Sequence, residues 1–165
     1  MPARVPATAY VGAMLAEIGS TGYDVMLVLH IASALVAFAP AFAHPLIERQ
    51  TRTLDAASRG VVLGFLAQNG RRVYAPALIV TGLLGFGLQG MSDSVWEMSQ
   101  TWIWLALLLW VAMNGVLHAM LLPAEKALAS GDESARQRVD LGGAILTVLL
   151  LVMLYLMVFK PGSPF

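Results

Sequence analysis

Three histidines are the residues of this chain best suited to do chemistry. His30 and His44 lie in one long apolar segment, separated by Pro40, and His118 lies in another. An ionisable side chain inside a membrane is usually kept for function, and imidazole is a common ligand of haem iron and of metal ions. On a helix, His30 and His44 share a face with small residues that leave room for a neighbouring helix or a flat cofactor: Ser33, Ala34, Ala37 and Ala41.

The distribution of charge along the sequence predicts the helices that must position these histidines. Of the 165 residues, 58% are hydrophobic and 12% are charged, and the charged fraction is about half that of a soluble domain. Asp, Glu, Lys and Arg are absent from residues 25–43, 73–92, 98–124 and 141–159. Since about 20 apolar residues cross the hydrocarbon core as a helix, we predict spans over residues 24–44, 73–92, 101–122 and 141–160.

Short connections between the spans favour antiparallel neighbours. The expected fold is therefore all-α, a single membrane domain over residues 1–165 that forms a four-transmembrane-helix antiparallel bundle. Residues 56–69 follow Asp55, a common helix N-cap, and are apolar on one side, which is typical of an interfacial helix. Residues 5–15 make a poor signal peptide and are expected to form a short helix at the membrane surface.

The basic residues predict the orientation of the bundle. Eight of the ten lie in residues 45–72 or 123–139, whereas the connection around Asp93 and Glu97 has none. By the positive-inside rule, both basic segments face the cytoplasm and both termini face outside. Trp96, Trp102 and Trp104 would then form an aromatic belt at the outer interface.

Depth in the membrane predicts which histidines could bind the same haem or metal ion. At 1.5 Å per residue, His30 lies ~9 Å, His44 ~30 Å and His118 ~25 Å below the outer ends of their spans. His44 and His118 are therefore the predicted axial ligands of a haem b, or ligands of a metal ion, near the cytoplasmic face. His30 is expected in a separate outer layer, together with Gln89 and Tyr155.

Three further residues are predicted to support the inner haem site. Asn114 lies four residues before His118 on the same face of the helix, so it could bond to that ring or hold the ligand with it. Arg71 and Arg72, at the cytoplasmic interface, are expected to pair with the haem propionates.

Other interpretations of these residues remain open. The histidines could instead make structural hydrogen bonds between helices, with His44 capping an interface. Nine methionines could serve a Cu(I) site, because thioethers bind that ion. They do not cluster in the sequence, however, which favours packing.

Several functional classes lack the residues they need. No acidic residue occurs within residues 25–43, 73–92, 98–124 or 141–159, so these segments lack the carboxylates that proton relays and paired-carboxylate chemistry require. No phosphate-binding loop and no nucleophile with an evident base occur, so no catalytic signature is visible. The absence of cysteine excludes disulfides, zinc–thiolate sites and iron–sulfur clusters. A net charge of zero and no basic stripe argue against nucleic acid as a partner.

Several short motifs resemble those of a known family. They are LHI at residues 29–31, RVYAP at 72–76, TGL at 81–83, Pro123, and YLMVFKPG at 155–162. With these motifs the chain resembles, from about residue 29 to 162, an uncharacterised bacterial family of four-helix predicted integral membrane proteins. That family is distantly similar to copper-resistance-D and haem-biosynthesis oxidase J type membrane proteins. This resemblance implies His30 as a haem ligand, in conflict with the pair chosen by depth.

The sequence thus predicts a multi-pass protein of the bacterial cytoplasmic (inner) membrane that binds haem b for membrane redox chemistry. An alternative is a non-catalytic accessory or assembly subunit that packs against other membrane subunits or against itself. A small transporter is a third, weakened by the lack of convincing inverted repeats.

Overall fold

The described part of the chain is helical and is built from four long helices. The computed structural model describes residues 18–163, so the helix expected within residues 5–15 lies outside the described residues. Each of the four continuous helices is long and apolar enough to cross a membrane. In chain order the elements are α2 (Thr21–Thr51), α3 (Ala56–Asn69), the π turn η1 (Gly70–Tyr74), α4 (Ala75–Gly90), α5 (Thr101–Val116), the π turn η2 (Leu117–Leu121), α6 (Leu122–Ala129), the 3-10 turn η3 (Glu133–Ala135) and α7 (Arg136–Phe159).

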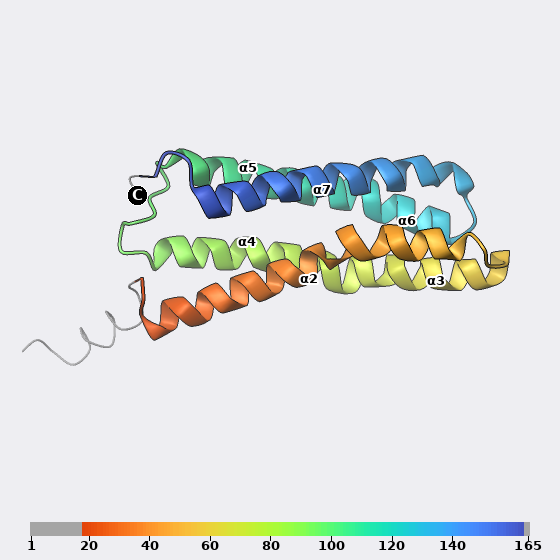
Figure 1. The fold of residues 1–165 in the computed structure, drawn as a ribbon, viewed down its shortest axis with the longest axis horizontal. Helices are drawn as coiled ribbons and strands as arrows, with labels where there is room; N and C mark the ends of the chain where they lie inside the picture. The colour runs from red at the N-terminus through yellow and green to blue at the C-terminus, as the bar shows by residue number, and fades with distance from the viewer. Residues whose placement is uncertain (1–17, 164–165) are drawn as a thin grey trace, which may run out of the picture.

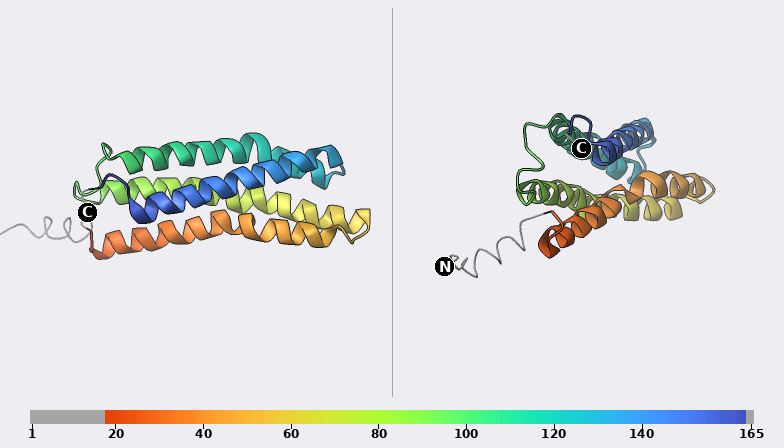
Figure 2. Two further views of the ribbon diagram at one scale, coloured as in Figure 1. Left: turned by 45° about the horizontal axis from the view of Figure 1, so that its top comes forward. Right: turned by 60° about the vertical axis from the view of Figure 1, so that its left-hand side comes forward.

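The long helices alternate in direction and form two layers (Figure 1). α2 packs mainly against α4, and α5 packs mainly against α7; Figure 2 shows the two pairs from other sides. The start of α2, the α4–α5 connection and the end of α7 lie together at what we call the tryptophan end, because Trp96 is in that connection. The opposite end, with the connections 52–55 and 130–132, is called the basic end.

Two clusters of buried side chains hold the bundle together. The first consists of Ala75, Leu78, Met113, Leu117, Leu122 and Leu150. The second lies at the basic end and consists of Leu63, Leu66, Ala124, Leu128 and Ala135. α2 alone has 31 residues, or ~46 Å of helix, against about 30 Å of hydrocarbon. The bundle therefore continues beyond its apolar segments as a basic tier, made of residues 44–51, 56–70, 124–129 and 133–140.

The helix expected at residues 56–69 is α3, and it does not stand apart from the spans. Asp55 caps it by accepting a hydrogen bond from the backbone N–H of Ser58 at 3.0 Å, and the bonds from Ser58 hold the pKa of Asp55 below its ordinary value. α3 then runs through η1 into α4 as one helix. One side of α3 is covered by α6, because Leu63 and Leu66 pack against Ala124 and Leu128, whereas Val61 and Phe65 are exposed.

The helices also continue through prolines, including the two that directly follow the predicted spans over residues 24–44 and 101–122. α2 contains Pro40 and Pro45 and continues to Thr51, and its ribbon changes direction partway along (Figure 1). The third long helix continues past Pro123 to Ala129. A proline ring clashes with the carbonyl four residues earlier, and the wider π turns η1 and η2 immediately precede Pro76 and Pro123. Each π turn relieves that clash, so the helix does not have to end.

Candidate functional site

One candidate site is an apolar cavity of about 690 Å³ between the two helix layers. All four long helices line it, through side chains that include Leu27, Phe38, Phe86, Ile103 and Leu150. Some lining residues are also exposed on the outside of the bundle, notably Leu35 of α2 (70%) and Leu154 of α7 (50%). The cavity therefore reaches the apolar exterior between α2 and α7. We call it the bundle cavity.

His30 is the one histidine, among the described residues, that lines the bundle cavity. Its Nδ1 donates a hydrogen bond to the carbonyl oxygen of Thr81 on α4 at 2.9 Å. Because a carbonyl can only accept, Nδ1 carries the proton and the neutral ring keeps a lone pair on Nε2. No described protein group bonds to Nε2. Histidines that ligate metals are commonly oriented in this way, by a bond from the other ring nitrogen to a carbonyl.

The sequence of α4 explains how the ring reaches that carbonyl. A Cβ at Gly85 would lie 3.3 Å from Cε1 of His30, so only glycine leaves the ring undisturbed there. Two hydroxyls complete the contact between the helices. Ser33 donates to the His30 carbonyl oxygen at 2.9 Å, and Thr81 Oγ1 donates to Ser33 Oγ at 2.9 Å or to the Ala77 carbonyl oxygen at 2.8 Å.

Other polar or polarisable side chains line the same cavity. Met113 of α5 is fully buried, and Met153 and Met157 line the cavity from α7. Lys160 lines it at the tryptophan end, where its Nζ lies 4.8 Å from the centre of a Trp96 ring. The sequence alone does not show that these residues share a cavity with His30. Whether the side chains of α7 face the cavity depends on how that helix is rotated about its axis relative to α2.

The predicted outer layer is only partly assembled. Gln89 lines the bundle cavity as His30 does, and its Nε2 donates to the Trp96 carbonyl oxygen at 2.8 Å. Tyr155 does not belong to the layer. It is 53% exposed, and its ring lies 4.9 Å from that of Phe159 on the outside of α7.

His44 lies in a different environment, at the border of the basic tier. Its Nδ1 donates to Oε1 of Glu125 on α6 at 3.2 Å, and its ring makes an edge contact with Tyr74 at 5.7 Å. The side chains of both partners are mostly buried, with 17% of His44 and 10% of Glu125 exposed. A Cβ at Gly70 would lie 3.0 Å from Oε2 of Glu125, so glycine there admits the carboxylate. The Nε2 atom of His44 is buried and has no hydrogen-bond partner.

His118, the predicted partner of His44, is exposed. His44 points at Glu125, whereas no described residue forms a hydrogen bond or ion pair with His118. The structure therefore does not assemble the predicted pair in one pocket. Equal depth fixes the height of a residue but not the direction in which it points. In the π turn η2, Leu117 is buried and the neighbouring His118 turns outward.

The supporting residues are also placed differently from the prediction. Asn114 donates to the Trp110 carbonyl oxygen of its own helix at 2.9 Å and not to His118. Arg71 and Arg72 are exposed and, with Lys126, line a separate groove of about 240 Å³ between α3 and α6. Across residues 18–163, no group of three or more His, Cys, Asp or Glu side chains could hold a metal ion.

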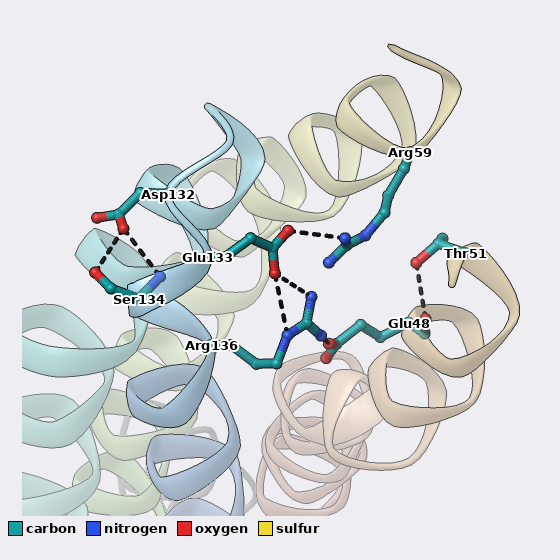
Figure 3. A network of polar contacts seen from close by, with 7 residues as sticks. All are labelled: Glu48, Thr51, Arg59, Asp132, Glu133, Ser134 and Arg136. Atoms are coloured by element: carbon teal, nitrogen blue, oxygen red, sulfur yellow. Dashed lines mark hydrogen bonds and ion pairs between the residues drawn. The ribbon is translucent and has the colours of Figure 1, made fainter. Parts of the chain in front are cut away.

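Two buried carboxylates were missed because they lie in helical residues beyond the predicted spans. Glu125 lies in α6 beyond Pro123, and Glu48 lies in α2 beyond Pro45. Glu48 accepts a short hydrogen bond from Nη1 of Arg136, and Arg136 also binds Glu133 with an Nη2–Oε2 distance of 2.7 Å. Glu133 in turn accepts from Nη1 of Arg59 at 2.8 Å. This network ties α2, α3, η3 and α7 together at the basic end (Figure 3).

No protein-family model, no curated protein and no solved structure matches this chain. The resemblance carried by the short motifs therefore stays a prediction, and function has to be argued from the residues described above.

Proposed function

We propose that this chain is a multi-pass protein of the bacterial cytoplasmic membrane that binds haem b in the bundle cavity, with His30 as an axial ligand, for membrane redox chemistry. The basic end would face the cytoplasm and both termini the outside, since eight of the ten basic residues lie in the segments at that end. The observation that carries the proposal is the unpartnered Nε2 of an oriented histidine in the wall of a large apolar cavity.

The cavity suits a flat, mainly apolar ligand. Its volume of about 690 Å³ lies in the usual range for ligand pockets, roughly 300–1,000 Å³. The opening between α2 and α7 would let such a ligand enter from the bilayer. When bound, haem b would supply one-electron transfer.

Several side chains of the cavity would hold the haem, each in a different way. Thr81 fixes the His30 ring and leaves Nε2 for the iron. Met113, Met153 and Met157 would offer thioether sulfur as a further ligand of the iron. Lys160 is the cation available to a propionate at the tryptophan end. The apolar walls exclude water, which favours a low dielectric around the iron.

The absorption spectrum of purified protein tests this proposal. The protein would be expressed with ample haem supply and purified in detergent. We expect a Soret band whose haem content approaches one per chain. A colourless protein under these conditions would contradict the haem proposal.

A second candidate function is that of an accessory subunit. The exposed rim of the cavity favours it, because an apolar helix from a partner or from a second copy could cover Leu35 and Leu154. If the chain is an accessory subunit, the purified protein should be colourless and should co-purify with a partner subunit or self-associate.

A further inference from the structure

The groove between α3 and α6 is the second candidate site of the molecule, and its lining is entirely different from that of the bundle cavity. It has a volume of about 240 Å³. Three cationic side chains line it, namely Arg71, Arg72 and Lys126, and no acidic residue does. Its remaining walls are mostly small, with Gly64, Ala67 and Ala129. Small walls leave room for a tetrahedral anion between the cations.

The positive charge of this groove is not neutralised by any residue that the structure describes. No described residue forms an ion pair or hydrogen bond with the side chains of Arg71, Arg72 or Lys126. The buried acids of the basic tier already have other partners, because Glu125 pairs with His44 and Glu48 pairs with Arg136. The groove is therefore a concentration of free positive charge in a tier whose buried charges are otherwise paired.

The position of the groove along the helices indicates which kind of anion would bind there. Arg71 and Arg72 directly precede the charge-free segment that begins at Val73, and Lys126 follows the charge-free segment that ends at Ala124. All three cations thus lie where the apolar part of the bundle meets the basic tier. In a membrane this border coincides with the level of the phospholipid phosphates. Below it, toward the tryptophan end, Val73 of η1 and Leu83 of α4 expose apolar side chains to the acyl chains.

We propose that this groove binds the phosphate of an anionic phospholipid. The guanidinium groups of Arg71 and Arg72 supply planar pairs of N–H donors that match phosphate oxygens, and Lys126 supplies a third charge from the facing helix. Such basic pockets between membrane helices are established lipid headgroup sites in general. The bound lipid would bridge α3 and α6. The proposal is independent of the bundle cavity and of any haem.

Binding can be measured on the full chain in a neutral detergent. The apparent affinity for short-chain phosphatidylglycerol is obtained from the rise in Tm during a titration, and native mass spectrometry counts the retained lipids. We expect one tightly retained phosphatidylglycerol per chain and a much smaller rise with phosphatidylcholine of the same acyl chains. The triple variant Arg71→Gln, Arg72→Gln, Lys126→Gln should bind about a hundredfold more weakly, since each basic residue near a membrane surface contributes roughly fivefold.

A matched control variant distinguishes a specific lipid site from a general effect of positive charge. The triple variant Arg49→Gln, Arg52→Gln, Arg138→Gln removes three exposed cations at the same end of the bundle that do not line the groove, and it should retain the lipid. Because all three groove side chains are exposed, the single variant Lys126→Gln should fold normally and lose roughly fivefold in affinity. Equal losses in the two triple variants would overturn the proposal. So would an equal rise in Tm with phosphatidylcholine, or full replacement of the lipid effect by inorganic phosphate at the same concentration.

Discussion

His30 and His44 lie in the same helix but differ in what holds their rings. A backbone carbonyl fixes His30, which lines an apolar cavity and whose Nε2 bonds to no described residue. A carboxylate fixes His44, whose Nε2 is buried without a partner. The sequence predicted that both rings would be functional or bonded between helices, but it could not show which nitrogen is free, because the partners Thr81 and Glu125 lie 51 and 81 residues away.

The buried pair of His44 and Glu125 should contribute measurably to stability. Removing either partner leaves the other buried without its bond, which is costly. We expect His44→Ala and Glu125→Gln each to lower the free energy of unfolding by about 1–3 kcal/mol. The double variant should lose less than the sum, with a coupling of about 1 kcal/mol or more. Chemical unfolding in detergent micelles at pH 7 measures all four proteins. Losses that add within ~0.3 kcal/mol would show that the two side chains do not interact.

The separation of charged from apolar residues along the sequence predicted where the long helices lie. It did not predict the π turns within them. Spans over residues 24–44 and 101–122 lie inside α2 and the third long helix, because a charge-free run of this length is helical in hydrocarbon. Both helices continue through the prolines that follow these spans, Pro45 and Pro123. A π turn adds one residue to a helical turn, and each added residue rotates the rest of the helix by about 100°. Such a turn depends on packing against other helices, so the outward direction of His118 could not be predicted.

The close contact between α4 and α5 gives a test at this scale. A Cβ at Gly82 would lie 2.2 Å from Cε2 of Trp110, and the indole cannot easily yield because its Nε1 donates to the Leu78 carbonyl oxygen at 2.8 Å. Gly82→Ala should therefore separate the two helices and lower stability by about 1–3 kcal/mol. Thermal unfolding followed by circular dichroism measures this loss.

Gly90 of the same helix provides the control for that substitution. A Cβ there would meet no atom within 4 Å, so Gly90→Ala should leave the Tm unchanged or slightly higher. Equal effects of the two substitutions would mean that α4 and α5 do not approach as closely at Gly82 as the structure shows.

The whole molecule combines an apolar part that surrounds the bundle cavity with a basic tier that is held by ion pairs. The sequence predicted the first part from composition alone. It did not predict the second, because the basic tier arises only when α2, α3, α6 and α7 extend past the apolar segments together and bury Leu63, Leu66 and Leu128 between them. The bundle cavity was likewise not predictable, since it depends on the spacing of the two helix layers.

His30, in the bundle cavity, is the histidine that we propose as the haem ligand. Absorption spectra distinguish it from the other two histidines when four proteins are compared: the unmutated protein and the variants His30→Ala, His44→Ala and His118→Ala, each purified from cells with ample haem supply. We expect His30→Ala to lose the haem or to change its coordination, while His44→Ala and His118→Ala keep the spectrum of the unmutated protein. Loss of the spectrum in both His44→Ala and His118→Ala, with His30→Ala unchanged, would contradict the claim and restore the pair chosen by depth.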